Sequence, residues 1–274
     1  MVASQETARF MTRIKCIAHA VWLEILRKKD VYVLLILLGA LLMVLVSLNV
    51  FGLGGLVIYV KDIGILMAWL FAWILSVNIS SRLLPQEHDR GTIYPLLAKP
   101  ITRMELLLGK WLGAWSIVSA ATLVFYMLVC AVVLLKGGPG SLNIKALLQG
   151  YVLHVTALAI VCALTLLFST RMNHDASSAL AYVLTLAAFA ILPRVPAFMV
   201  KAKGLSAAVF MVMYNVLPHF EVLDLRKRIV HDYGPAGTGT FLAVLLYGIL
   251  YTIALLFASW LAYRKKRFSR GTLT

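Results

Sequence analysis

The chain has 274 residues and a formal net charge of +15, and 62% of its residues are hydrophobic while only 14% are charged. A soluble domain of this length would expose too much apolar surface, so the composition excludes an ordinary soluble protein and indicates a polytopic membrane protein. Basic charge beside membrane spans is typical of loops near anionic lipid headgroups, and no nucleic-acid-binding motif accompanies it, so nucleic acid is not an expected partner.

Residues 1–30 are predicted to be a cytoplasmic lead followed by an elbow helix that lies in the membrane interface. Apolar residues recur at helical spacing through Ile14, Ile17, Val21 and Ile25, with Arg and Lys on the other faces. An early start to the first span is the alternative. The polar beginning lacks the short apolar core of a removable signal peptide.

Residues 31–274 are predicted to form one all-α transmembrane domain with six spans. The six apolar runs cover residues 31–51, 63–84, 111–135, 144–168, 176–192 and 240–263. Between the last two spans, residues 193–237 form an outer segment. Within it, residues 205–217 are too short to span and too apolar for water, so a re-entrant or interfacial helix is expected.

The distribution of basic residues predicts the orientation. Six spans place both termini on one side, together with most of the 26 Lys and Arg residues, and the positive-inside rule makes that side the cytoplasm. A seventh span through residues 205–217 would place the basic C-terminal tail outside. Both termini are therefore expected to be cytoplasmic.

The interval 83–110, between the second and third spans, is the most charged stretch that separates two long apolar runs. Thr92 can cap a short helix that ends before Pro100. Thr102 and Glu105 then have the spacing of a capping box, which predicts a second helix running directly into the third span. The sequence therefore predicts a stiff, kinked and charged connector.

This connector resembles the one between the second and third spans of the type-2 ABC exporter permeases. The matching positions, in chain order, are Glu87, Gly91, Thr92, Leu96, Leu97, Pro100, Ile101, Thr102, Arg103, Gly109 and Lys110. Relatives often carry Glu three residues after the Thr, where this chain has Pro95; Pro is tolerated in a first helical turn. The match is specific over the connector, and the rest of the chain agrees in layout only.

The resemblance implies a permease in the bacterial cytoplasmic membrane that works as a dimer with a second permease copy and two cytoplasmic ABC ATPase subunits. ATP and Mg²⁺ would bind the partner subunits, and no cofactor is expected in this chain. The apolar face of the short helix would dock on the ATPase, with flanking charges fixing its register. The candidate coupling residues are Glu87, Arg90, Gly91, Thr92, Ile93, Leu96, Leu97, Pro100 and Arg103. A solvated loop with ordinary helix caps is the alternative.

The common catalytic motifs are absent from the sequence. Gly109-Lys110 lacks the upstream glycine of a phosphate-binding loop, because Met104 stands there, so this chain is not expected to hydrolyse ATP alone. No zinc-protease helix or nucleophile elbow occurs, and Cys16, Cys130 and Cys162 are scattered. No catalytic or metal-binding residue is predicted.

Polar residues within the apolar runs are candidates for a substrate pathway, because they are costly to place in a membrane. Asn78, Gln149 and His154 are the candidates. A histidine satisfied by a neighbouring helix is the alternative for His154. Acidic residues and His231 in the stretch 221–232 could meet substrate or a periplasmic partner, or could belong to a solvated loop.

The sequence therefore predicts the permease subunit of an ATP-binding-cassette exporter, coupling ATP hydrolysis on another chain to export. Family members handle drugs, lipids, polysaccharides and antibiotics, and similar permeases take part in maturing copper enzymes, so the substrate is open. Two alternatives come from other classes. One is a membrane-embedded enzyme using His154 or the 221–232 stretch, and the other is a membrane anchor or assembly factor that transports nothing.

Overall fold

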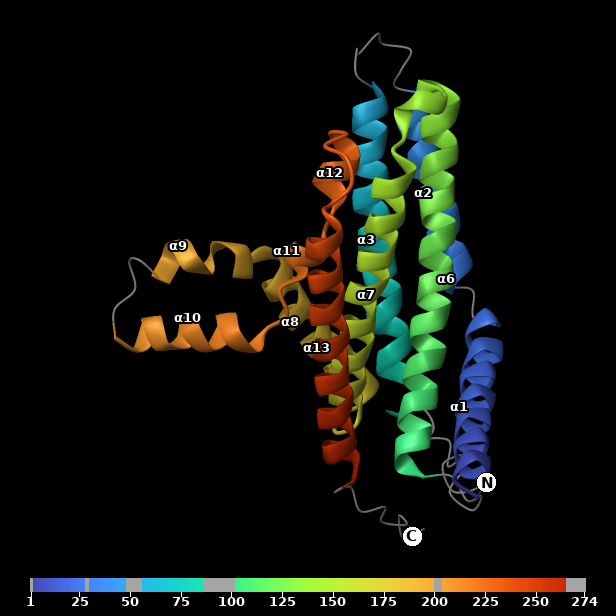
Figure 1. The fold of residues 1–274 in the computed structure, drawn as a ribbon, viewed down its shortest axis with the longest axis vertical. Helices are drawn as coiled ribbons and strands as arrows, with labels where there is room; N and C mark the ends of the chain where they lie inside the picture. The colour runs from blue at the N-terminus through green and yellow to red at the C-terminus, as the bar shows by residue number, and fades with distance from the viewer. Residues whose placement is uncertain (1, 28–29, 48–55, 86–101, 200–203, 265–274) are drawn as a thin grey trace.

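The structure is a computed structural model that describes residues 2–27, 30–47, 56–85, 102–199 and 204–264. Throughout these residues the regular elements are helices, and none is a strand. Mostly long, apolar helices lie side by side in an upright bundle (Figure 1). The helices that run along its long axis are α2 (Asp30–Ser47), α3 (Leu56–Arg82), α6 (Arg103–Gly137), α7 (Ile144–Ser169) and α13 (Thr238–Arg264).

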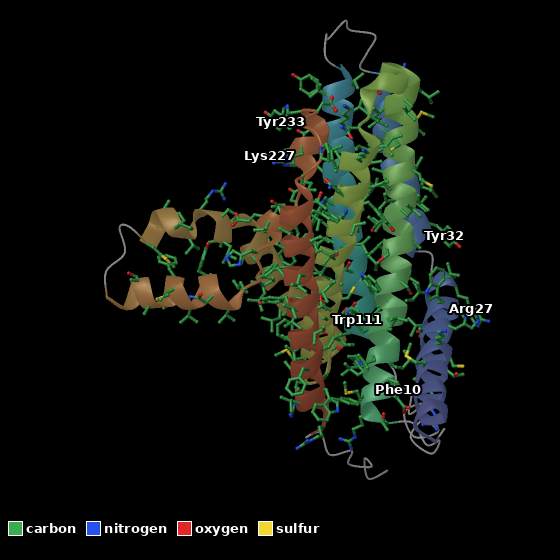
Figure 2. All side chains as sticks on the ribbon, in the orientation of Figure 1. Phe10, Arg27, Tyr32, Trp111, Lys227 and Tyr233 are labelled. Carbon is green, nitrogen blue, oxygen red and sulfur yellow. The ribbon has the colours of Figure 1, made fainter. Side chains whose placement is uncertain are left out.

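The two ends of the bundle are called the basal end and the distal end. The basal end holds the start of α1 (Val2–Leu26), the start of α6 and the end of α13 (Figure 1). The distal end holds the start of α3, the end of α6 and the short turn η2 (Pro139–Ser141). Lys227 and Tyr233 also lie at this distal end, while Phe10 lies at the basal end (Figure 2).

By length and composition, six helical segments of the described residues could cross a membrane. They are Val57–Arg82, Arg103–Gly137, Ile144–Ser169, His174–Met199, Ser206–Val230 and Thr238–Arg264. All but Ser206–Val230 correspond to predicted spans, and the predicted first span corresponds to α2, whose apolar part Tyr32–Val44 is shorter. The chain is thus an all-α, multi-pass membrane protein, as the sequence predicts.

Ser206–Val230 is not one helix but three. After α8 (His174–Ala190), which packs on α3 and α7, come η3 (Leu192–Arg194), α9 (Val195–Met199), α10 (Leu205–Val216), α11 (Phe220–Leu223) and α12 (Arg226–Val230). In Figure 1, α9 and α10 project sideways from the bundle, and the stacked rings of Phe198 and Phe210, with centroids 6.1 Å apart, pack one against the other. The outer segment is therefore a series of short helices, in which α10 occupies the stretch where a helix is expected; its re-entrant or interfacial position stays a prediction.

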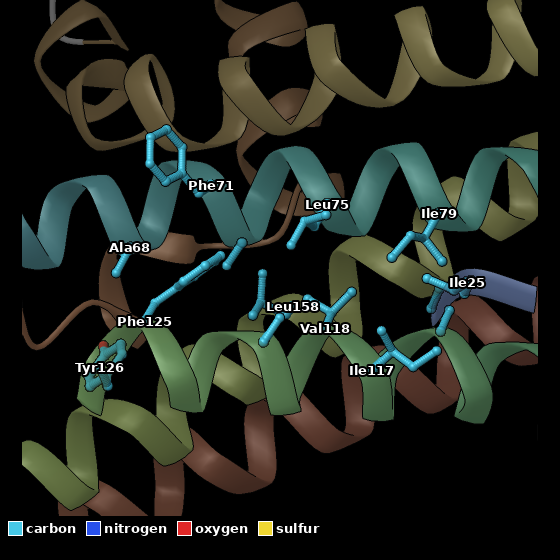
Figure 3. Packing of buried hydrophobic residues seen from close by; sticks show 14 of the residues in the cluster. Ile25, Ala68, Phe71, Leu75, Ile79, Ile117, Val118, Phe125, Tyr126 and Leu158 are labelled. Atoms are coloured by element: carbon cyan, nitrogen blue, oxygen red, sulfur yellow. The ribbon is translucent and has the colours of Figure 1, made fainter. Parts of the chain in front are cut away.

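The core lies where α3, α6 and α7 meet. Leu75 and Ile79 of α3 point towards α6, where Phe125 lies, and Leu158 of α7 lies close by (Figure 3); the rings of Phe71 and Phe125 have centroids 6.3 Å apart. Phe71, Leu75 and Ile79 all belong to α3. Their spacing along α3 repeats every four residues, so these side chains share one face of the helix. The other face of α3 is left for α8, α12 and the distal contacts described below.

Helix α1 buries the stripe that its periodicity predicts, because Ile14, Ile17, Val21 and Ile25 are all buried. It packs against α6 along the basal part of that helix. At 35 residues, α6 is about 52 Å long, which exceeds the roughly 30 Å hydrocarbon core of a bilayer by about 20 Å. The position of α1 relative to the membrane interface stays a prediction.

Candidate functional site

The first turn of α6 carries the capping box that the sequence predicts. Thr102 has extended backbone angles, and its hydroxyl oxygen accepts a hydrogen bond from the backbone N–H of Glu105 at 3.2 Å. The Glu105 carboxylate in turn accepts the backbone N–H of Thr102 at 2.6 Å. These two bonds satisfy N–H groups that a helix start would otherwise leave without partners, so the connector ends in a rigid helix.

Glu105 also ties α6 to α1. Its side chain is only 3% exposed, and the Arg13 guanidinium lies 3.3 Å from Oε1. A buried carboxylate needs such partners, because an unpaired charge is expensive to keep away from water. One side chain therefore caps α6 and holds α1 to it.

Two glycines let α1 approach the backbone of α6 closely. A Cβ at Gly109 would lie 2.7 Å from Cβ of Ile17, and a Cβ at Gly113 would lie 2.8 Å from Cβ of Val21. These contacts and the Arg13–Glu105 pair each join positions 92 residues apart, so α1 and α6 run parallel in a fixed register. Glycines four residues apart are the usual device for close helix packing in membrane proteins.

Two further cations of α6 bind the ends of other helices. Lys110 is buried, and its ammonium donates a hydrogen bond to the backbone carbonyl of Leu83, just after α3 ends. Arg103 donates to the carbonyls of Tyr263 at 3.2 Å and Arg264 at 2.8 Å, at the end of α13. Cations stabilise helix C-termini, where carbonyl groups lack partners.

The start of α6 is thus joined to α1, α3 and α13 by side chains within eight residues, and we call this set the basal clamp: Arg13, Leu83, Arg103, Glu105, Gly109 and Lys110. The first and last residues of the predicted connector, Leu83 and Lys110, both belong to this clamp. Arg103 is the described member of the predicted coupling residues. The others, Glu87, Arg90, Gly91, Thr92, Ile93, Leu96, Leu97 and Pro100, lie outside the described residues.

The three predicted pathway residues do not form one cluster. On α3, the Asn78 amide oxygen accepts a hydrogen bond from Arg82 at 3.0 Å. Near the start of α7, both polar groups of Gln149 bind the backbone of Ala236, at 2.7 and 3.1 Å. His154 lies more than one turn further along α7. Each side chain therefore has its own local partners.

His154 is completely buried and held mainly by aromatic rings. Its ring stacks on Trp69 with a centroid separation of 4.1 Å, and Nδ1 lies 3.3 Å from the Tyr126 hydroxyl. Among the described residues, Nε2 has no hydrogen-bond partner. Beside Trp69, between α3 and α8, lies an apolar groove of about 200 Å³ whose lining also includes Trp73 and Phe189. The structure places His154 in packing contacts and leaves its substrate role a prediction.

Sequence reasoning missed most of the basal clamp. The spacing of Gly109 and Gly113 is visible in the sequence, and in a helix next to an amphipathic segment it could have predicted close packing with α1. Arg13 and Lys110 give no such signal, because their partners lie 92 and 27 residues away in the sequence. Their contacts depend on which helices are neighbours, and composition does not specify this.

Comparison with known families identifies the class of this bundle. A family model described as "ABC-2 family transporter protein" matches residues 61–267, which is most of the chain. The chain belongs to the ABC-2 family of transporter proteins. A search of curated proteins gave no match. The match to the ABC-2 family begins within α3 and includes the connector and the remaining spans, so α1 and α2 precede the matched region.

Membership of the ABC-2 family makes the chain an ABC transporter permease, the membrane component of a transport system. Such permeases typically work with ABC ATPase partners. The all-α bundle of membrane-spanning helices fits this class. The basal clamp contains both ends of the predicted connector, Leu83 and Lys110.

Proposed function

We propose that this chain is the permease subunit of an ATP-driven exporter and that its connector receives force from a separate cytoplasmic ATPase subunit. The basal clamp supports the proposal most directly. Lys110 binds the carbonyl of Leu83 at the point where the connector leaves, and the capping box at Thr102 fixes the point where it returns. A displacement of the connector would therefore act on α3 and α6 together.

The same geometry explains how a movement at the connector would reach the membrane. Helix α6 continues without a break from Arg103 to Gly137, so its first turn and its membrane part move as one rod. Helix α1 follows it through the glycine contacts, and α13 follows through Arg103. In this proposal the coupling residues of 87–103 press on the ATPase, and these helices shift with them.

The remaining features of the proposal follow from the family and the charge distribution. In this proposal the basal end faces the cytoplasm of a bacterium, with both termini there, because the positive-inside rule assigns the basic sequences of the connector and the C-terminal tail to that side. A second permease copy completes the transporter, and the pathway runs near Asn78, Gln149 and His154.

Co-purification tests the coupling proposal. The chain is expressed with its ATPase subunit, and Leu96 and Leu97 are both replaced by Asp, which removes the apolar face predicted to dock. We expect the ATPase to be lost from the purified complex while membrane insertion is unchanged. Leu273→Asp, in the C-terminal tail on the same predicted side, is the control for adding an acidic side chain there and should retain the ATPase.

The result also separates the alternatives. Undiminished co-purification of the Leu96→Asp, Leu97→Asp variant would contradict docking through the connector. A permease should change the ATP turnover of its partner. A membrane anchor should bind its partner and leave turnover unchanged, and a membrane-embedded enzyme should be active in detergent without ATP.

A further inference from the structure

A buried lysine ties the distal end of α3 to the outer segment. The Lys61 side chain is 2% exposed, and its ammonium lies 3.0 and 2.9 Å from the two carboxylate oxygens of Asp232. Asp232 itself is 55% exposed. The apolar stem of Lys61 is thus buried in the bundle, and its charge is neutralised by a residue that follows α12.

Two other contacts hold the same part of the outer segment. The guanidinium Nε of Arg226, at the start of α12, lies 3.6 Å from Asp62 on α3. Beyond Asp232, the backbone of Ala236 forms two hydrogen bonds with the side chain of Gln149 on α7. Residues 226–236 are therefore fastened across the distal ends of two bundle helices at three points.

Asp232 has a backbone conformation that favours glycine, which indicates that its carboxylate has a role that glycine could not fill. Its φ of 51° lies in the left-handed region, and the N–H of Tyr233 donates back to the carbonyl of Arg228, as at a helix C-terminus of the Schellman type. Glycine fits this position with less strain, because it has no Cβ. The side chain that occupies it is the one that reaches Lys61.

Helix α3 links this contact to the predicted connector. It runs without a break from Leu56 to Arg82, so Lys61 near its start and Leu83 just past its end belong to one continuous segment. Leu83 is held by Lys110 of the basal clamp. Because a helix is stiff over this length, a shift of α3 at the basal end would change the position of Lys61 at the distal end.

We propose that residues 226–236 are a latched cap over the distal end of the bundle, and that Lys61–Asp232 is the latch that α3 releases when the connector moves. The release of the latch by α3, which we call gating, rests on the proposed function. The latch itself, the Lys61–Asp232 contact that holds the cap, does not. A contact with one exposed partner suits such a role, since water can solvate the Asp232 carboxylate when the pair separates. The cap shown here is the closed state.

Hydrogen exchange measured by mass spectrometry tests the latch in the permease purified with its ATPase subunit in lipid nanodiscs. The readout is the peptide covering residues 231–237, in which the Ala236 amide is bonded to Gln149. Without nucleotide, Asp232→Asn should speed exchange there about fivefold, the effect of losing roughly 1 kcal/mol. Asn tolerates the left-handed backbone as Asp does, so only the charge is removed.

Two variants make this result specific to the ion pair. Lys61→Glu combined with Asp232→Lys restores opposite charges and should return exchange towards the original rate. Asp175→Asn removes another exposed aspartate, at the basal end, and should leave the 231–237 peptide unchanged. Equal exchange in Asp232→Asn and the unmodified chain, or faster exchange throughout the bundle, would overturn the latch.

The gating half is tested by trapping the ATPase with ATP and vanadate. In the unmodified chain, amide exchange in residues 231–237 should then become as fast as in Asp232→Asn. The Asp232→Asn variant itself should exchange at the same rate with and without the trapped nucleotide. A complex that hydrolyses ATP but shows no nucleotide effect on this peptide would overturn gating. Failure of any ATPase to co-purify would instead contradict the proposed function, while the nucleotide-free comparison would still decide the latch.

Discussion

The two ends of the bundle use ion pairs with opposite burial. At the basal end the carboxylate is buried and the cation is partly exposed, because Glu105 is 3% exposed and Arg13 is 35% exposed. At the distal end the cation is buried, and Asp232 is more than half exposed. Each pair joins a long bundle helix to another part of the chain, α6 to α1 and α3 to the residue after α12. The difference lies in what else supports each contact.

The basal contact is reinforced by continuous packing of two long helices, and the distal contact by shorter, separate contacts. Glu105 also caps α6, and the glycines beside it bring two helix backbones together over several turns. Around Lys61 the helices of the outer segment are short, and they are held by separate polar contacts and by the buried side chains of Ile229 and Val230 on α12. The comparison indicates a basal end that moves as one body and a distal end that can open.

The largest expected effect comes from filling the glycine contacts. Gly109→Leu combined with Gly113→Leu should separate α1 from α6, because overpacking costs about 1–3 kcal/mol at each site and backbone atoms of α1 lie within 3.2 Å of the new Cβ positions. Trypsin cleavage at the exposed Lys15 of α1 should become about tenfold faster, since separation lets that helix unfold locally.

Gly39→Leu on α2 is the control for this experiment, since a Cβ there would meet nothing within 4 Å. It introduces the same side chain and should leave cleavage at Lys15 unchanged. If the double variant were cleaved no faster than this control, α1 would not depend on the glycine contacts. The basal end would then not move as one body.

A second prediction concerns Glu105. Glu105→Ala removes the ion pair with Arg13 and half of the capping box, and should lower the free energy of unfolding by about 1–2 kcal/mol. Asp232→Asn should lower it by less than about 1 kcal/mol, because the Asp232 side chain is 55% exposed and Asn keeps an oxygen that can accept from the Lys61 ammonium. Thermal unfolding in detergent measures both. Glu221→Ala, at an exposed site of the outer segment, is the control. If it lowered the free energy of unfolding as much as Glu105→Ala does, the contrast between the two ends would be lost.

The third prediction uses salt. Raising ionic strength from about 50 mM to about 500 mM shortens the Debye length and weakens exposed ion pairs more than buried ones. Hydrogen exchange at residues 231–237 should accelerate, while exchange of the capped Glu105 amide should not. The same acceleration at both ends would show that the two pairs are equally exposed to solvent.

The smallest effect is expected for a substitution of His154, which lies between the two ends of the bundle. His154→Phe keeps a ring that can stack on Trp69 and removes the contact with Tyr126. If the histidine serves packing, the thermal midpoint and the turnover of the reconstituted transporter should change little. His154→Ala, which also removes the stack, is the matched comparison. A large loss of transport in His154→Phe with unchanged stability would instead favour a pathway role.

Much of the fold could be predicted from the sequence because the signals are local. Apolar runs specify the spans, the stripe from Ile14 to Ile25 specifies the buried face of α1, and Thr102 with Glu105 specifies where α6 begins. Each of these depends on residues within a few turns of one helix. The prediction of the capping box in particular is confirmed to the residue.

The contacts between distant residues could not be predicted in this way. Lys61 and Asp232 are 171 positions apart, and the sequence around each resembles an ordinary charged loop. Gln149 is a pathway candidate in the sequence because it is polar within an apolar run, whereas its amide binds the backbone of Ala236. The predicted coupling residues from Glu87 to Pro100 lie outside the described residues and stay a prediction.

The glycine pair on α6 also limits how a second subunit can associate. Close-packing surfaces of this kind commonly pair one chain with another copy of itself. Here the groove at Gly109 and Gly113 is already occupied by Ile17 and Val21 of the same polypeptide. Two copies in a homodimer must therefore contact each other through other faces. Deleting α1 should expose this close-packing surface of α6 and promote non-native oligomers.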